Sequence, residues 1–265
     1  MPSPTDPARS PAAPPVDKAL LDFAVDLDRE AGESTLRWFL ARDLTVDSKA
    51  DGTPVTAADR TAERLVRSRL AEAFPDDGVL GEEEAETAGA SGRRWIVDPI
   101  DGTKAFTRGV PLYSTLLALD DEHGPAIGVI VLPALRQAVY AGRGLGAWFD
   151  GEPARVSDTS AVDGAYLTTS SYSHWPDPDL LAVKHAGFHL RTWGDGYGYA
   201  LVATGRADAM VDHVVEVYDV APMPVIMGEA GGRFTSLDGR PGAAGGSGVA
   251  TNGALHDEVL GLLEG

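Results

Sequence analysis

The chain has 265 residues, of which 43% are hydrophobic, and its 40 acidic and 22 basic side chains give a formal net charge of −18. This length and apolar content are typical of a packed globular protein and exclude wholesale disorder. The negative charge disfavours nucleic acid and anionic membranes as partners, although a highly soluble or salt-adapted surface carries such a charge too. No cysteine is present, which excludes disulfides and thiolate metal sites and fits a reducing compartment.

The sequence shows no pattern typical of a secretory signal or a membrane span. The N-terminal stretch has no basic segment followed by an apolar run, so we expect no secretory signal. No stretch approaches the roughly 18 consecutive apolar residues of a membrane span. We therefore expect a cytoplasmic protein with neither a membrane nor a nucleic acid as its partner.

The first half of the chain is expected to hold two helices followed by a run of strands. Residues 1–15, rich in proline, alanine and serine, predict a disordered tail. Asp17 can cap a first helix that runs on towards Trp38, and a second helix is expected to begin near Thr56 to Asp59 and to end at Pro75. Apolar or alternating segments then predict strands at 79–80, 95–97, 114–119, 126–132, 137–141 and 147–149.

The second half alternates between the two kinds of element. Strands are expected at 166–170, 190–193, 207–211, 233–236 and 248–251, and helices at 178–186, 197–204, 220–228 and 255–263. In the third of these helices Pro222 fits the opening turn, whereas Pro224 is expected to perturb it. The alternation predicts an α/β fold, with helices packed on sheets in two halves (about 16–150 and 151–265) of one domain.

The most informative stretch runs from Asp98 to Thr103. It places two carboxylates three residues apart beside a proline, and the apolar segment 95–97 precedes it. The pattern predicts a strand, an acidic turn and the start of a helix. Crowded carboxylates repel one another, and a bound divalent cation relieves that repulsion. The amides that follow Asp101 can bind a phosphate at a helix N-terminus.

Three further acidic segments stand at junctions between expected elements: Asp59, Glu82 to Glu84, and Asp219. Oxygen ligands without cysteine favour Mg²⁺ or Mn²⁺ over zinc. Each segment also has a simpler interpretation. The glutamate run is typical of a solvated turn, Asp59 and Asp219 of helix N-caps, and the Asp98–Asp101 stretch of a plain turn.

Four segments in this order resemble the inositol monophosphatase superfamily: 81–83, 95–103, 218–221 and 228–232. The resemblance extends from about Lys49 to Asn252. It implies a layered α/β/α/β/α sandwich of the inositol monophosphatase and fructose-1,6-bisphosphatase type. It also implies a Mg²⁺-dependent phosphomonoesterase, in which two cations neutralise the substrate and lower the pKa of the attacking water.

The resemblance implies a metal-ligand set. Glu82, Asp98 and the carbonyl of Ile100 would hold a first Mg²⁺, and Asp98 would bridge to a second one held by Asp101 and Asp219. Glu82 would touch a third, weaker ion, and Mn²⁺ is an alternative metal.

The resemblance also implies the groups that handle water and phosphate. Asp59 would pair with Thr103 to orient and deprotonate the attacking water, so that these two residues and Glu82 form the catalytic set. The amides of Gly102 and Thr103 would hold phosphate oxygens, and Lys49 would lie near the ions.

Three segments suggest which substrate the protein uses. They are 104–113, 190–199 and 201–208, and they resemble the histidinol-phosphatase branch of the superfamily. That branch would convert L-histidinol phosphate to L-histidinol in histidine biosynthesis. Asp195 and Asp212 can pair with the ammonium and the imidazole of this substrate, and an aromatic ring of Trp175, Trp193 or Tyr197 can face the cationic ring. The simpler interpretations are an N-cap for Asp195 and helix packing for Tyr197 and Tyr199.

Two positions depart from the pattern of the branch, because Gly196 stands where cysteine is common and Tyr218 where tryptophan is usual. An inositol-1-monophosphatase or a broad sugar-phosphate phosphatase therefore remains an alternative. A catalytically inactive relative is a third, although the complete acidic set speaks against it. The resemblance further implies a homodimer and inhibition by Li⁺.

Overall fold

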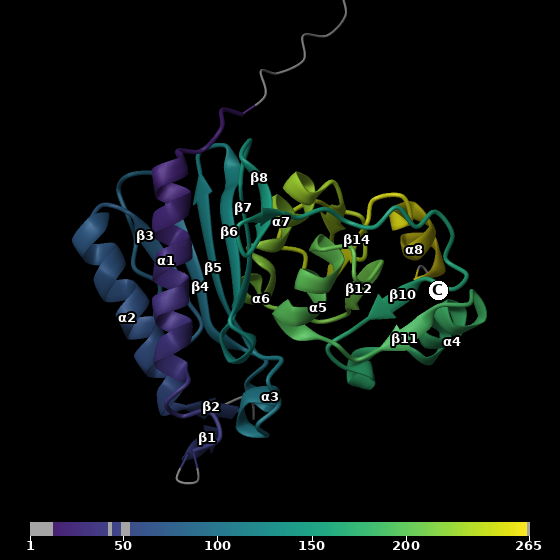
Figure 1. Cartoon of the computed structure of the whole chain (residues 1–265), viewed down its shortest axis with the longest axis horizontal. Coiled ribbons are helices and arrows are strands. Elements are labelled where there is room, and N and C mark those ends of the chain that lie inside the picture. Colours follow the sequence, from purple (N-terminus) through teal and green to yellow (C-terminus); the bar gives the residue numbers. More distant parts are fainter. Residues whose placement is uncertain (1–12, 42–43, 49–53, 264–265) are drawn as a thin grey trace, which may run out of the picture.

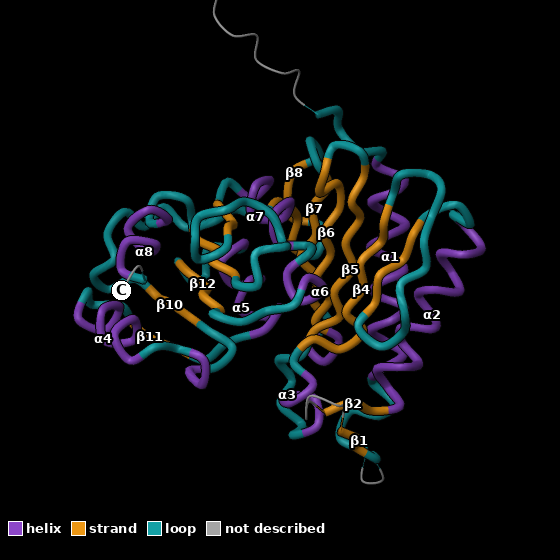
Figure 2. Tube along the Cα trace, turned by 180° about the vertical axis from the view of Figure 1, so that it is seen from behind, coloured by secondary structure: helices purple, strands orange, loops and turns teal. Residues whose placement is uncertain are grey.

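The structure is a computed structural model that describes residues 13–41, 44–48 and 54–263. Its elements form five layers in the order helices, sheet, helices, sheet, helices (Figures 1 and 2). The α/β/α/β/α sandwich implied by the resemblance is therefore confirmed. Within the described residues, no helix has both the length and the apolar character that crossing a membrane requires.

The first layer consists of α1 (Lys18–Thr35) and α2 (Ala57–Ala73), which pack on one face of the larger sheet. Asp17 caps α1 as expected, by accepting a hydrogen bond from the amide of Ala19. Helix α1 ends at Thr35, before the predicted end near Trp38. A small hairpin of β1 (Val46–Ser48) and β2 (Pro54–Thr56) leads into α2.

The larger sheet has seven strands, paired in the order in which they occur along the chain. Only its first pair is parallel, and every later pair is antiparallel. The strands are β3 (Gly78–Gly81), β4 (Arg94–Asp101), β5 (Ser114–Asp121), β6 (Gly124–Leu132), β7 (Gln137–Gly142), β8 (Gly146–Phe149) and β9 (Glu152–Pro153). The short helix α3 (Thr103–Thr107) follows β4, and the 3₁₀ turn Pro133–Leu135 follows β6.

The middle layer is made of α5 (Asp195–Ala203), α6 (Val217–Val220) and α7 (Met223–Ala230). Helices α5 and α7 contact strands of both sheets. The largest apolar cluster joins Leu116 and Ile130 of the larger sheet to Tyr199 and Met223 of these helices. The two halves of the chain therefore share one core.

The smaller sheet has five strands in the order β11-β10-β12-β14-β13. Their bounds are β10 (Tyr166–Thr168), β11 (His189–Arg191), β12 (Ala209–Asp212), β13 (Arg233–Thr235) and β14 (Gly248–Thr251). Helices α4 (Asp177–His185) and α8 (His256–Leu262) form the fifth layer, together with the 3₁₀ turn Tyr172–His174.

One expected helix is divided in two. The segment predicted as a helix over 220–228 becomes α6 and α7, because α6 ends at Val220 and α7 begins at Met223. Pro222 is the N-cap residue of α7 and Pro224 lies in its first turn, where no backbone N–H is needed. Pro224 thus fits a helix start instead of disturbing a helix.

Candidate functional site

The turn from β4 into α3 has the predicted form of a strand, an acidic turn and a helix start. The amide of Ile100 donates to Asp98 Oδ1 at 3.1 Å, and the pairing of β4 with β5 shifts register between Asp98 and Asp101. Gly102 then takes φ +80°, a left-handed conformation that favours glycine, before α3 begins. The chain therefore folds both carboxylates back towards one point.

Three acidic side chains meet at this point. Asp98 and Asp101 of β4 and Asp219 of α6 each offer a carboxylate oxygen, and these oxygens lie within 4.8 Å of one another. Asp219 is the third residue of α6 and accepts a hydrogen bond from the amide of Glu216 at 2.8 Å, so it belongs to a capping box instead of being the N-cap itself. Residues more than a hundred positions apart in the sequence are thus brought together.

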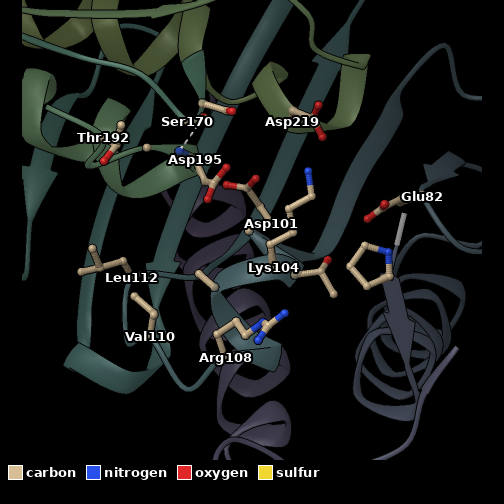
Figure 3. A pocket seen from close by; sticks show the side chains of 16 residues that line it. Glu82, Asp101, Lys104, Arg108, Val110, Leu112, Ser170, Thr192, Asp195 and Asp219 are labelled. Carbon is tan, nitrogen blue, oxygen red and sulfur yellow. Dashed lines mark hydrogen bonds between the residues drawn. The ribbon is translucent and has the colours of Figure 1, made fainter. Parts of the chain in front are cut away.

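Glu82 joins this cluster from the neighbouring strand. Strands β3 and β4 are parallel with Gly81 opposite Val97, so the next residues, Glu82 and Asp98, emerge side by side. Figure 3 shows the Glu82 carboxylate across the pocket from Asp101 and Asp219. Glu82 therefore lies close enough to Asp98 for its charge to act on that carboxyl, and Ile100 lies in the same turn as Asp98 and Asp101.

The electrostatics of the cluster are those of acids that lack a counter-charge. Burial, followed by the charges of Glu82, Asp101 and Asp219, raises the pKa of Asp98 well above its ordinary value. Burial also raises the pKa of Asp101, followed by the charges of Asp195 and Asp219. Burial raises the pKa of Asp219 to about 7. Several oxygen ligands that resist ionisation together fit a divalent cation, whose charge offsets their repulsion.

Asp59 supplies a second observation that fits a cation and its bound water. Its Oδ2 accepts hydrogen bonds from the amide and the hydroxyl of Thr56, the N-cap residue of α2. Its Oδ1 is buried and has no hydrogen-bond partner in the described part of the chain. Because a buried polar atom without a partner is costly, this oxygen is suited to a water at the site. Asp59 is the third residue of α2, which corrects the N-cap interpretation.

The expected pairing of Asp59 with Thr103 does not occur as a direct hydrogen bond among the described residues. The hydroxyl of Thr103 donates instead to the carbonyl of Ile100 at 3.0 Å. Asp59 lies in the first turn of α2, whereas Thr103 begins α3 and lines the pocket. Any joint action of the two on a water requires the water to lie between them.

Asp101 is held from both halves of the chain. Ser114 Oγ donates to Asp101 Oδ2 at 2.8 Å, and the amide of Gly196 in α5 donates to the same oxygen. A Cβ at position 196 would lie 2.9 Å from that oxygen, so glycine permits this close approach. Sequence reasoning did not single out Ser114, although it begins a strand that pairs with Asp101.

Asp195 enters the pocket from the first residue of α5, with the residue before it, Gly194, as the N-cap. Its φ is +55°, and its amide donates to Ser170 Oγ at 2.8 Å (Figure 3). This left-handed backbone is uncommon for a residue with a side chain and is often found at functional sites. Burial, followed by the charge of Asp212, raises the pKa of Asp195 to about 6. The N-cap interpretation of Asp195 is wrong.

These groups open into a cavity of about 500 Å³. The acidic groups Glu82, Asp101, Asp195 and Asp219 line the cavity, and Figure 3 shows the Lys104 side chain extending towards them, with Arg108 further away. The remaining lining residues are Pro54, Gly102, Thr103, Ala105, Val110, Leu112, Ser170, Ser171, Thr192 and Gly194. Lys49, expected near the ions, lies outside the described residues.

Asp212 is placed differently from the expectation that it pairs with substrate. It does not line the cavity, and its oxygens accept hydrogen bonds from Thr169 Oγ1, from the amide and hydroxyl of Ser170, and from the Tyr199 hydroxyl. Asp212 thus holds the loop that contains Ser170 through hydrogen bonds. Asp212 and Ser170 lie far apart in the sequence, so no local pattern predicts the contact between them.

The aromatic rings expected to face a cationic substrate are also elsewhere. Trp193 is partly exposed and stacks on Tyr166, whereas Trp175 is buried against His213. Tyr197 packs against the central core, as does buried Tyr199. The packing interpretation of the two tyrosines is confirmed, and none of the three candidate rings lines the described cavity.

Comparison with known proteins agrees with this geometry. The profile of the inositol monophosphatase family matches residues 17–264. The chain belongs to the inositol monophosphatase family. A histidinol-phosphatase of Mycobacterium tuberculosis is 45% identical over 249 residues, covering 91% of this chain and 96% of the relative.

Two further relatives place the chain within the family. A histidinol-phosphatase of Chlorobaculum parvum is 43% identical, and the match covers 92% of this chain and 96% of the relative. The crystal structure of the extragenic suppressor protein suhB of Bartonella henselae superimposes with a TM-score of 0.86 at 30% identity, over 93% of this chain and 98% of that one. The family resemblance inferred from the acidic segments is therefore confirmed.

Proposed function

We propose that this protein is a Mg²⁺-dependent phosphomonoesterase that hydrolyses L-histidinol phosphate to L-histidinol and phosphate. The observation that carries the proposal is the convergence of carboxylate oxygens of Asp98, Asp101 and Asp219 within 4.8 Å of one another, with Asp101 and Asp219 lining the cavity. The similarity to two histidinol-phosphatases at more than 40% identity supports the choice of substrate. Histidine biosynthesis would be the corresponding pathway.

The metal ligands follow from the cluster. Glu82, Asp98 and the Ile100 carbonyl would hold one Mg²⁺, and Asp98, Asp101 and Asp219 a second, with Glu82 available to a third and Mn²⁺ as a substitute. When bound, the cations neutralise the phosphate and lower the pKa of a coordinated water. Ser114 and the Gly196 amide fix Asp101 so that its other oxygen can act as a ligand.

The chain itself would supply the base and the phosphate contacts. Burial raises the pKa of Asp59, which suits a group that accepts a proton from water near neutral pH. Its unpartnered Oδ1 is the atom that would accept this proton, with the Thr103 hydroxyl orienting the water. The amides of Gly102 and Thr103, together with Lys49, would bind the phosphate oxygens.

Asp195 would discriminate between substrates. Its carboxylate lies in the cavity beside Asp101 (Figure 3), where a cationic group on the leaving alcohol would meet a negative charge. Histidinol carries an ammonium group, whereas inositol carries only hydroxyls. Asp212 would contribute indirectly, through Ser170.

A phosphate-release assay tests the proposal. Histidinol phosphate, inositol 1-phosphate and fructose 1,6-bisphosphate are compared with Mg²⁺ and with EDTA. We expect histidinol phosphate to have the highest kcat/KM and EDTA to abolish turnover. Preference for inositol 1-phosphate would favour the inositol-1-monophosphatase alternative, and Mg²⁺-independent turnover would contradict the metal assignment.

Lithium provides a further expectation. Because one ion is held more weakly than the others, we expect millimolar Li⁺ to reduce turnover at limiting Mg²⁺ and excess Mg²⁺ to reverse the effect. Turnover that is unchanged by Li⁺ at limiting Mg²⁺ would contradict a weak, exchangeable ion.

We further propose a cytoplasmic homodimer without nucleic-acid or membrane partners. The net charge of −18 supports the lack of nucleic-acid and membrane partners, because both are polyanionic surfaces that such a protein repels. The exposed rings of Tyr166 and Trp193, with Arg191 over both, form a surface suited to a second copy. Light scattering that reports the mass of a single chain would contradict the dimer.

A further inference from the structure

We infer that Glu63 is a positioning residue that sets the metal affinity of the site by holding the loop of Glu82; this inference rests on the proposed function. Glu63 lies one turn after Asp59 on α2, is fully buried, and does not line the cavity. Its carboxylate contacts the loop that follows β3. It is therefore placed to act through Glu82.

The contacts of Glu63 fix the backbone immediately after Glu82. Its Oε2 accepts a hydrogen bond from the amide of Glu83 at 2.7 Å, and its Oε1 accepts one from the amide of Glu84 at 3.0 Å. Hydrogen bonds from two consecutive amides to one carboxylate restrict the orientation of both peptides. The direction in which the Glu82 side chain leaves the backbone is thereby set.

The residue before Glu82 is fixed by the same carboxylate. A Cβ at Gly81 would overlap the carboxylate of Glu63, so only glycine allows the end of β3 to pack directly against that carboxylate. Glu82 is thus held from both sides, by contact at Gly81 and by hydrogen bonds at Glu83 and Glu84.

Arg67 completes the arrangement one turn further along α2. Its Nε donates to Glu63 Oε1 at 2.8 Å, and its other nitrogens donate to the carbonyl of Glu84 at 3.0 Å and to Thr87 Oγ1 at 3.3 Å. The guanidinium neutralises a carboxylate that is otherwise buried, so Glu63 remains an acceptor for both amides. Helix α2 therefore carries Asp59 and, through Glu63 and Arg67, also aligns Glu82.

The chemistry of a glutamine at this position makes the inference testable. Glu63→Gln keeps the size of the side chain but replaces one acceptor oxygen with an NH₂ group, which cannot accept from an amide. The loop must then rotate or leave one amide unpaired, and Glu82 shifts with it. Substitutions behind a metal ligand typically weaken metal binding by about 10- to 100-fold.

The experiment measures Mn²⁺ binding to the metal-free protein by the loss of the free Mn²⁺ electron paramagnetic resonance signal. Glu63→Gln is expected to weaken binding at least about 10-fold. Glu86→Gln removes the same charge from the same loop, where Glu86 forms a largely solvent-exposed ion pair with Arg94 at 3.5 Å, and is expected to bind within about twofold of wild type. Circular dichroism at the assay temperature establishes that each variant is folded.

Glu82→Gln separates this inference from the proposed function. If Glu82→Gln binds Mn²⁺ like wild type, the ligand assignment itself is wrong. If Glu82→Gln weakens binding but Glu63→Gln matches Glu86→Gln, the positioning role is wrong and the proposed site stands. If Glu63→Gln does not fold, Arg67→Lys takes its place. Lysine keeps the charge but cannot make the three hydrogen bonds of Arg67 to Glu63, Glu84 and Thr87 together. Unchanged Mn²⁺ binding by Arg67→Lys would overturn the inference.

Discussion

At the scale of single residues, the site depends on where each carboxylate oxygen points. Asp101 illustrates this, because Ser114 and the Gly196 amide both donate to its Oδ2. That oxygen accepts two hydrogen bonds, and a carboxylate oxygen of Asp101 lies within 4.8 Å of one from Asp98 and one from Asp219. An acidic residue in a turn becomes a metal ligand only when its neighbours restrict it in this way.

Asp101→Asn tests the role of this residue. The amide removes a negative charge from the cluster and one metal ligand, so we expect kcat/KM to fall by about 100-fold or more at saturating Mg²⁺. Phosphate release is the measurement. Asp177→Asn, at an exposed position in the first turn of α4, is the control and should keep full activity. Equal activity of both variants would contradict the assigned ligand.

Asp28 is a buried acid that the site does not use. It lies in α1 and is fully buried. Burial raises its pKa to about 8. The folded protein therefore holds a proton that the unfolded chain releases above its ordinary value of 3.8, so stability falls as pH rises between these values.

Asp28→Asn removes this pH-dependent loss. We expect the free energy of unfolding of the variant to exceed that of wild type by about 1–3 kcal/mol at about pH 8. The difference should shrink towards about pH 5. Urea denaturation in EDTA at both pH values is the measurement. A difference that does not change with pH would show that Asp28 is ionised in the folded protein.

At the scale of elements, the turn between β4 and α3 joins the two halves at the site. A Cβ on Gly102 would lie 2.7 Å from Asp195 Oδ2, so the turn of the first half approaches the first residue of α5. Helix α5 in turn donates to Asp101. The acidic turn and the N-terminus of α5 therefore act as one structural unit.

Gly102→Ala tests this contact, with Gly164→Ala as its control. Both glycines have nearly the same left-handed φ, +80° and +82°, but nothing lies near a Cβ at Gly164. The backbone strain of about 1–2 kcal/mol should be common to both variants. Only Gly102→Ala should also raise KM, because it displaces Asp195. Steady-state kinetics and thermal unfolding separate the two effects, and an unchanged KM would contradict the contact.

At the scale of the whole molecule, the two halves meet in a shared core and leave a strongly acidic pocket between them. The cluster costs stability when its acids ionise without a cation. Because burial raises the pKa of Asp219 to about 7, metal-free stability falls as pH rises through that value. Cation binding needs the ionised acids, so protons compete with it below about pH 7.

Thermal unfolding with and without Mg²⁺ measures this linkage. We expect Mg²⁺ to raise Tm at both about pH 5.5 and about pH 8, and the rise to be larger by about 3 °C or more at the higher pH. NaCl at matched ionic strength is the control. A rise that is equal at both pH values would mean that the cluster is already ionised at the lower one.

Much of the local structure around the site can be predicted from the amino-acid sequence alone. Hydrophobic periodicity and turn residues predicted most elements, and the stretch from Asp98 to Thr103 predicted a strand, an acidic turn and a helix start, as observed. These features depend on neighbours within a few residues, so they can be read along the chain. The roles of Asp59, Glu82 and Asp219 were implied by the resemblance of the acidic segments, in their order along the chain, to the inositol monophosphatase superfamily.

Only the tertiary structure decided which side chains act on one another. The register of β4 with β5 brings Ser114 to Asp101, and the packing of α5 adds the Gly196 amide. The same packing turns Asp212 away from the cavity and towards Ser170, against the expectation from sequence. Such pairings arise when strands pair and helices pack around a common core. No local pattern encodes them, because the free energy of that burial is set by the whole interface.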